Sequence, residues 1–162
     1  MNKKLLILTG TPGTGKSTLA KKLAGKLGFD RLDLHHYYRQ LSVGYNRQKQ
    51  CYDIDVKKLE KLVREKLSSS KKGLILDSHL AHLLPKKLVT LCLVLTCSDL
   101  KQLQRRLKKR NYPPAKIREN LEAEIFRVCL EEAREQGHRL IVLDTAKPFS
   151  FPTLLRQIRK SL

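Results

Sequence analysis

The chain has 162 residues, enough for one domain with its own hydrophobic core, and no stretch approaches the roughly 20 apolar residues of a membrane span. Lys and Arg total 34 against 15 acidic residues, a formal net charge of +19. This composition excludes a membrane-spanning protein. The charge excess favours an acidic partner such as RNA, and the alternative is a basic surface with no such partner.

The N-terminus runs directly into an apolar segment, so we expect no signal peptide. The four cysteines have no C-x-x-C spacing, and we expect free thiols, with Cys92 buried in an apolar run. These features predict a cytoplasmic protein, or a nuclear one if the source is a eukaryote, without membrane association. We also expect a monomer.

Residues 10–17 read Gly-Thr-Pro-Gly-Thr-Gly-Lys-Ser, the complete phosphate-binding pattern G-x-x-x-x-G-K-[ST]. An apolar run at Leu5–Leu8 precedes it and predicts a buried strand, and apolar residues at helical spacing follow it up to Leu27. Glycines let the backbone N–H groups converge on phosphate oxygens. We expect Lys16 to reach the β- and γ-phosphates and Ser17 to bind Mg²⁺, so the chain is expected to bind a nucleoside triphosphate.

Strand-like runs then alternate with helical patterns along the chain. The further strands are expected at residues 31–34, 74–76, 89–95 and 140–143. The helices are expected at residues 56–67, at 100–107 with Ser98 as N-cap, from 117 to a stop at Gly137, and from Thr153 to Leu162. This order predicts an α/β fold of the P-loop NTPase class, a doubly wound five-stranded parallel sheet flanked by helices, in a single domain over residues 1–162.

An acidic residue follows the third of these strands, in the segment Leu76-Asp77-Ser78-His79. A carboxylate at a strand end beside a phosphate loop is the expected partner of Mg²⁺, directly or through a water, so Asp77 is a candidate metal ligand. In an extended chain His79 would point the same way as Asp77 and could orient a water. The alternatives are a turn-capping Asp77 and a structural His79.

A basic cluster occupies residues 105–110 and is followed by Asn111-Tyr112-Pro113-Pro114. Arg106 and Arg110 are four residues apart, on one helical face. Two guanidinium groups on a flap suit phosphoryl transfer, because negative charge spreads over the oxygens of the moving group. We therefore expect a short lid at about residues 106–118, and the alternative is a basic helix on a solvated surface.

The segment His35-His36-Tyr37-Tyr38-Arg39 lies where a second substrate would bind. We expect His36 and Arg39 to contact that substrate, with Arg39 on its phosphate. A nucleoside monophosphate already presents an anionic oxygen, so its phosphorylation needs no general base. Transfer to a sugar hydroxyl would need a carboxylate, and Asp33 is the candidate for that alternative.

With these residues, the chain resembles the nuclear or archaeal-type adenylate kinase/ATPase family. The resemblance rests on residues 5–24, on Leu76–His79 as the family's Asp-x-His, and on residues 106–126, whose pattern is more specific than the loop. It departs at His35-His36, where the family often has Gly-Asp, and at Arg110-Asn111-Tyr112, where the usual residues are Arg-Gly-Tyr. Asn tolerates a positive φ, so the turn in the lid can form.

The resemblance implies a five-stranded core, a monophosphate-binding region at about residues 30–53, and transfer from Mg-ATP to AMP with an added ATPase activity. It implies nucleotide contacts from Gly10, Gly13, Thr14, Gly15, Lys16, Ser17 and Thr18, from Arg110 as the lid arginine, and from Lys147 near the adenine. It also implies a small-subunit ribosomal protein or rRNA as partner, in small-subunit maturation. The alternatives are an assembly ATPase with little kinase role, and a small-metabolite kinase of the shikimate or gluconate type.

Overall fold

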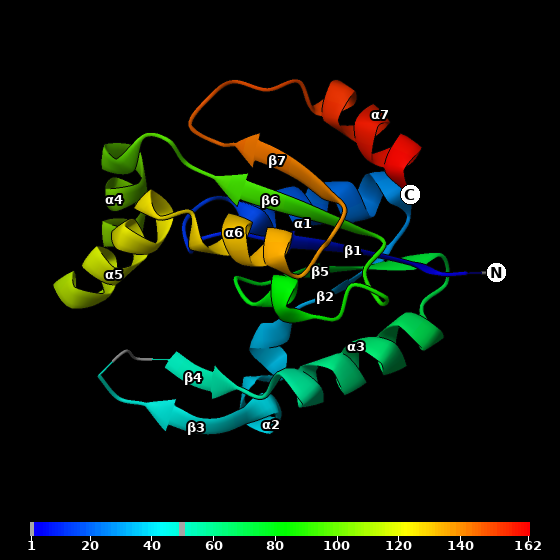
Figure 1. Cartoon of the computed structure of the whole chain (residues 1–162), viewed down its shortest axis with the longest axis horizontal. Coiled ribbons are helices and arrows are strands. Elements are labelled where there is room, and N and C mark those ends of the chain that lie inside the picture. The colour runs from blue at the N-terminus through cyan, green and yellow to red at the C-terminus, as the bar shows by residue number, and fades with distance from the viewer. Residues whose placement is uncertain (1, 49–50) are drawn as a thin grey trace.

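The computed structural model of the chain describes residues 2–48 and 51–162. Five parallel strands form the central sheet in the order β2-β5-β1-β6-β7 (Figure 1). The strands are β1 (Lys4–Thr9), β2 (Asp30–Leu32), β5 (Gly73–Asp77), β6 (Leu91–Thr96) and β7 (Leu140–Asp144). The predicted α/β class and five-stranded parallel sheet are therefore confirmed.

Helices cover both faces of the sheet, which is why its strands are continuous apolar runs. Leu6 and Leu8 of β1 face the helices α1 (Lys16–Leu27) and α7 (Phe151–Ser161). Leu5 and Ile7 face the opposite side, where α2 (Tyr38–Leu41), α3 (Val56–Ser69) and α6 (Val128–Glu135) pack. All four side chains are fully buried, so β1 lies at the centre of the apolar layers on both faces of the sheet.

Two smaller units lie on the side of the sheet to which the carboxyl ends of the strands point (Figure 1). One is an antiparallel hairpin of β3 (Ser42–Asn46) and β4 (Cys51–Ile54). The other is the pair α4 (Leu100–Lys109) and α5 (Pro114–Ile125), which has its own apolar cluster around Leu103, Leu107 and Ile117. The hairpin was not predicted, because its strands are short and mostly exposed or half-buried.

The long helix predicted from residue 117 to Gly137 is wrong. Arg127 has a φ of 51°, and this residue divides the predicted helix into α5 and α6. A left-handed residue cannot continue a right-handed helix, and the periodicity on its two sides conceals the break. Asn111 is the other non-glycine residue with a positive φ, at 56°, among the described residues, which confirms that an Asn forms this turn.

Several predicted boundaries also need correction. Asp99, not Ser98, caps α4, because its carboxylate accepts the hydrogen bond of Gln102 N–H. The second strand ends at Leu32, since Asp33 caps the short 3-10 helix Leu34–His36 by accepting the N–H of His35. Ser150 caps α7, which therefore begins before Thr153.

All four cysteines are free thiols, and Cys92 is fully buried, as predicted. Within residues 2–48 and 51–162, no helix combines the length and the apolar character that a bilayer crossing requires.

Candidate active site

The phosphate loop leaves β1, the central strand of the sheet, and ends at the first turn of α1. Gly10 must be glycine, because a Cβ there would lie 2.2 Å from the carbonyl oxygen of Leu95. Gly15 has a φ of 94° in the left-handed region, where it turns the loop into the helix. Gly13 packs beneath α4, where a Cβ would lie 3.1 Å from Leu103.

Helix α1 begins without a side-chain cap in the described structure, as do α2, α5 and α6, whereas Asp55, Asp99 and Ser150 cap α3, α4 and α7. The first N–H groups of a helix have no intrahelical acceptor. At α1 these donors and the positive end of the helix dipole are available to an anion. This geometry matches the phosphate-binding role predicted for the loop.

Lys16 folds over the loop, and its Nζ donates hydrogen bonds to the carbonyl oxygens of Gly10 at 2.7 Å and Thr11 at 3.0 Å. Burial is the main cause that lowers the pKa of its ammonium group to about 8, and the charge of Arg110 acts in the same direction. The neighbouring acids Asp77 and Glu124 act in the opposite direction. The negative charge of a bound phosphate would therefore stabilise the protonated form of Lys16, which burial disfavours.

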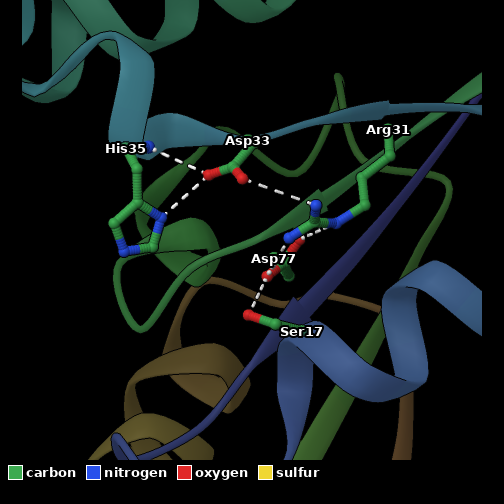
Figure 2. A network of polar contacts seen from close by, with 5 residues as sticks. All are labelled: Ser17, Arg31, Asp33, His35 and Asp77. Atoms are coloured by element: carbon green, nitrogen blue, oxygen red, sulfur yellow. Dashed lines mark hydrogen bonds and ion pairs between the residues drawn. The ribbon is translucent and has the colours of Figure 1, made fainter.

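Ser17 and Asp77, the two predicted Mg²⁺ ligands, are in contact, with Ser17 Oγ donating a 2.7 Å hydrogen bond to Asp77 Oδ2. Figure 2 shows that Arg31 of β2 lies on the other side of this carboxylate. Its Nε donates to Oδ1 at 2.9 Å and its Nη2 to Oδ2 at 3.2 Å. The Asp77 side chain is only 5% exposed, so this bidentate pair fixes its orientation.

The oxygen donors present here fit a magnesium ion. Mg²⁺ in nucleotide sites takes one or two protein oxygens and fills its other positions with phosphate oxygens and water. The hydroxyl of Ser17 and the carboxylate of Asp77 supply such oxygens beside the loop. No cluster of three or more His, Cys, Asp or Glu side chains suited to a metal occurs in the described part of the chain.

The same polar network continues towards the expected acceptor region (Figure 2). Arg31 forms a second ion pair with Asp33 at 3.5 Å. Asp33 also accepts hydrogen bonds from the backbone N–H of His35 at 3.1 Å and contacts its Nδ1 at 2.8 Å. Asp33 is therefore engaged by both neighbours, which counts against a free general base at this position. His36 and Arg39 are exposed on the adjoining segment.

Arg106 and Arg110 take different places at the end of α4. Arg106 is half-buried, and its Nη1 donates to the carbonyl of Gly13 at 3.2 Å and to Thr145 Oγ1 at 3.4 Å. It therefore touches the phosphate loop itself. Arg110 is the C-cap of the helix and is exposed, yet its charge acts on the ammonium of Lys16.

A buried carboxylate that sequence reasoning did not assign ties α5 to the loop. Glu124 is 8% exposed, and its Oε2 accepts a 2.6 Å hydrogen bond from Thr11 Oγ1. Its Oε1 accepts a 2.7 Å hydrogen bond from the N–H of Cys97, the residue directly after β6. Glu124 thus fixes a loop residue from 113 positions further along the chain. Its place in the resembling segment 106–126 was the only signal for it.

His79 does not continue the strand, because β5 ends at Asp77 and His79 lies in the following turn. The expectation of an extended His79 is therefore wrong. The charge of Lys16 nevertheless acts on the ring of His79. Shielding from water by the surrounding protein lowers its pKa to about 4, and the charge of Lys16 adds to that effect. The ring is neutral near pH 7, although part of the residue is exposed.

The remaining predicted residues border the loop or lie beyond it. Thr14 is buried, and its hydroxyl donates to the carbonyl of Thr11 at 2.8 Å, so it stabilises the loop from within. Thr18 is exposed on the first turn of α1. Lys147 lies after β7, largely exposed, 3.8 Å from a carboxylate oxygen of Asp144. Its expected contact with adenine stays a prediction.

A parallel sheet of this order, with a phosphate loop after the central strand and an acid at the end of the adjacent one, defines a P-loop NTPase domain. The profile of the AAA domain family matches residues 6–127. The chain is 39% identical to adenylate kinase isoenzyme 6 homolog of Caenorhabditis elegans, over 85% of this chain and 76% of that protein. It is 38% identical to the protein of the same name from Schizosaccharomyces pombe, over 86% and 79%.

The chain therefore belongs to the adenylate kinase family that includes these isoenzyme 6 homologues. Among solved structures, shikimate kinase from Acinetobacter baumannii in complex with shikimate matches 98% of this chain and 92% of its own, with a TM-score of 0.61 and 16% identity. That likeness demonstrates a common fold.

Proposed function

We propose that this chain is a nucleoside monophosphate kinase that transfers the γ-phosphoryl group of Mg-ATP to AMP and forms two ADP. The observation that carries the proposal is the convergence of Lys16, Ser17 and Asp77 on the loop after β1. The names of the relatives support AMP as the acceptor.

In the proposed reaction, a phosphate oxygen of AMP attacks the γ-phosphorus and the bond from that phosphorus to the β,γ-bridging oxygen breaks. The acceptor oxygen is already anionic, so no proton need be removed. Bound Mg²⁺, held by Ser17 and Asp77, would neutralise charge on the β- and γ-phosphates. The protein then has to hold the two nucleotides in line and to supply positive charge where negative charge develops.

Three cations of the chain suit that task. Lys16 lies on the loop, Arg106 is bonded to the loop carbonyl of Gly13, and Arg110 acts on Lys16 from the exposed end of α4. Arg39 is the proposed ligand of the acceptor phosphate. Arg31, in contrast, is committed to Asp77 and Asp33, so it acts as a positioning residue for the metal ligand.

A coupled assay with AMP, other nucleoside monophosphates, shikimate, gluconate and a no-acceptor control tests this proposal. ADP formation that requires AMP, with two ADP per ATP consumed, is the expected result. Lys16→Ala should abolish it without loss of the fold. Turnover with a hydroxy acid alone would overturn the proposal in favour of a small-metabolite kinase, and near-normal turnover by Lys16→Ala would remove the phosphate-loop assignment.

The net charge of +19 favours a second function, an ATPase cycle on a ribosomal protein or RNA during small-subunit maturation. Exposed cations gather near the lid, at Arg105, Lys108, Lys109 and Arg110. Contacts with RNA phosphates release counterions, so RNA affinity should fall steeply with salt, whereas ATP affinity should fall much less. Absence of RNA or ribonucleoprotein binding even at low salt, or of stimulated ATP hydrolysis, would leave only the kinase.

A further inference from the structure

The face of the molecule that α1 and α7 form carries basic side chains and no acidic ones. Both helices pack on the same side of the sheet, where Leu19 and Leu23 of α1 share an apolar cluster with Leu154 and Ile158 of α7. Neither helix contains an Asp or a Glu. Their exposed cations, which we call the α1–α7 basic face, are Lys21, Lys22, Lys26, Arg156, Arg159 and Lys160.

The helices on the opposite side of the sheet have a different balance of charge. Acidic residues accompany the cations of α3 and α6, at Glu60, Glu65, Glu131, Glu132 and Glu135. Two of these acids form 2.7 Å ion pairs with an arginine of the same helix. Within the described ranges, no cation of the α1–α7 basic face forms an ion pair. The positive charge of this face is therefore uncompensated by the protein itself.

Two contacts hold α1 and α7 side by side as one surface. The Nζ of Lys22 lies 4.1 Å from the centroid of the Phe151 ring, at the start of α7. Towards the other end of α7, the Nη2 of Arg159 donates a 3.1 Å hydrogen bond to the carbonyl oxygen of Lys26. The two helices are thus joined near both ends of α7, and their cations belong to a single basic area.

An open groove lies along α7 within this area. Its volume is about 440 Å³, and it is lined by Pro152, Leu155, Arg156, Arg159 and Lys160. Positions 152, 156 and 160 are four residues apart, so they follow one another along one side of the helix. The groove therefore combines two apolar residues with three cations and contains no acid.

The chemistry of this surface fits the phosphate backbone of a nucleic acid better than other acidic partners. Interfaces between proteins are depleted in lysine, whereas nucleic-acid interfaces are rich in positive charge. A helix bound to a membrane surface buries its apolar face in lipid, but the apolar residues Leu154 and Ile158 of α7 are buried against the sheet. Unpaired cations on an exposed surface can instead neutralise a row of phosphates.

We propose that the α1–α7 basic face binds the phosphate backbone of RNA, with Arg156, Arg159 and Lys160 contacting phosphates along the groove of α7. This inference rests on the second function proposed above and assigns the RNA to a surface other than the lid. Figure 1 shows α7 well apart from α4 and α5. RNA on this face therefore leaves the nucleotide site open, and contacts to phosphates make binding largely independent of base sequence.

Neutral and charge-retaining variants test the role of the basic face. The neutral variant combines Lys21→Gln, Arg156→Gln and Lys160→Gln, which replace exposed cations whose charged groups have no partner in the described part of the chain. The charge-retaining variant combines Lys21→Arg with Lys160→Arg. Thermal unfolding and the affinity for a non-hydrolysable ATP analogue should match the wild type in both, because neither variant changes the core or the phosphate loop.

A matched control removes the same amount of charge from the lid. It combines Arg105→Gln, Lys108→Gln and Lys109→Gln, at exposed positions of α4. The probe is a fluorescently labelled single-stranded RNA of mixed sequence, and anisotropy titrations at several salt concentrations give its affinity. A saturating ATP analogue is added in one series, and unlabelled polyglutamate competes with the RNA in another.

The neutral basic-face variant should bind RNA at least roughly tenfold more weakly at low salt. The slope of its log affinity against log salt should be smaller by about 2, because each of three lost phosphate contacts on a single strand contributes about 0.7. The charge-retaining variant should bind like the wild type, and the lid control should lose much less affinity. The ATP analogue should leave the RNA affinity unchanged.

Wild-type RNA affinity in the neutral basic-face variant would overturn the inference, and so would an equal or larger loss in the lid control. Displacement of RNA by the ATP analogue would also overturn it, as would polyglutamate that competes as well as RNA at equal charge. If the triple variant does not fold, Arg156→Gln alone repeats the test with a smaller expected loss. A wild-type protein that binds no RNA even at low salt would refute the second function itself, so the two failures are distinguishable.

Discussion

The lowered pKa of Lys16 makes nucleotide binding depend on pH in a range where few other groups of the site titrate. Its ammonium has a pKa of about 8, well below the usual 10.5 of lysine, because it is buried. Near pH 7 about nine-tenths of the molecules carry this charge, and near pH 9 about one-tenth. Triphosphate binding favours the charged form, so the affinity should fall as pH rises through 8.

The expected size of the effect is about a tenfold loss of ATP affinity between pH 7 and pH 9, if only the charged form binds well. His79 is already neutral across this range, with a pKa of about 4. Burial raises the pKa of the thiol of Cys129, the second residue of α6, above its usual value. Titration of neither group would therefore produce a tenfold decrease of ATP affinity between pH 7 and pH 9. Calorimetric titration with a non-hydrolysable ATP analogue measures the affinity at each pH.

Lys16→Arg is the decisive control, because a guanidinium stays charged throughout this range. Its affinity for ATP should be lower than that of the wild type at pH 7 if the longer fork fits the loop less well, but it should not change with pH. A wild-type affinity that is constant to pH 9 would refute the argument. So would an equal decrease in Lys16→Arg, since the titrating group would then be another one.

Three further variants test other parts of the site. Asp77→Asn should weaken Mg²⁺-dependent turnover more than Mg²⁺-free nucleotide binding, and equal Mg²⁺ dependence in variant and wild type would make Asp77 a turn residue. Arg110→Ala should lower kcat by roughly ten- to a thousandfold with a much smaller change in ATP affinity, and the reverse pattern would make it a binding residue. Glu124→Ala leaves Thr11 Oγ1 and the N–H of Cys97 unpaired, so it should destabilise the fold by about 2–4 kcal/mol, which lowers the Tm by roughly 4–16 °C, and an unchanged Tm would contradict this account.

The sequence by itself determined the features that depend on neighbouring residues. The buried strand Leu5–Leu8, the glycine pattern of residues 10–17 and the start of α1 are contiguous, and their local conformations follow from apolar runs and from glycine. The alternation of strands and helices then limits the architecture to a covered parallel sheet. The meeting of Ser17 with Asp77 could also be predicted, because strands in such a sheet end at one edge.

Only the tertiary structure decided which distant side chains support that site. Arg31 reaches Asp77 because β2 pairs with β5, and Glu124 reaches Thr11 because α5 folds back over the loop. The break at Arg127 likewise has no local signal, since apolar residues recur on both sides of it. Local patterns report on conformation within a few residues. A hydrogen bond between residues 113 positions apart depends on the packing of whole elements, which no window of the sequence contains.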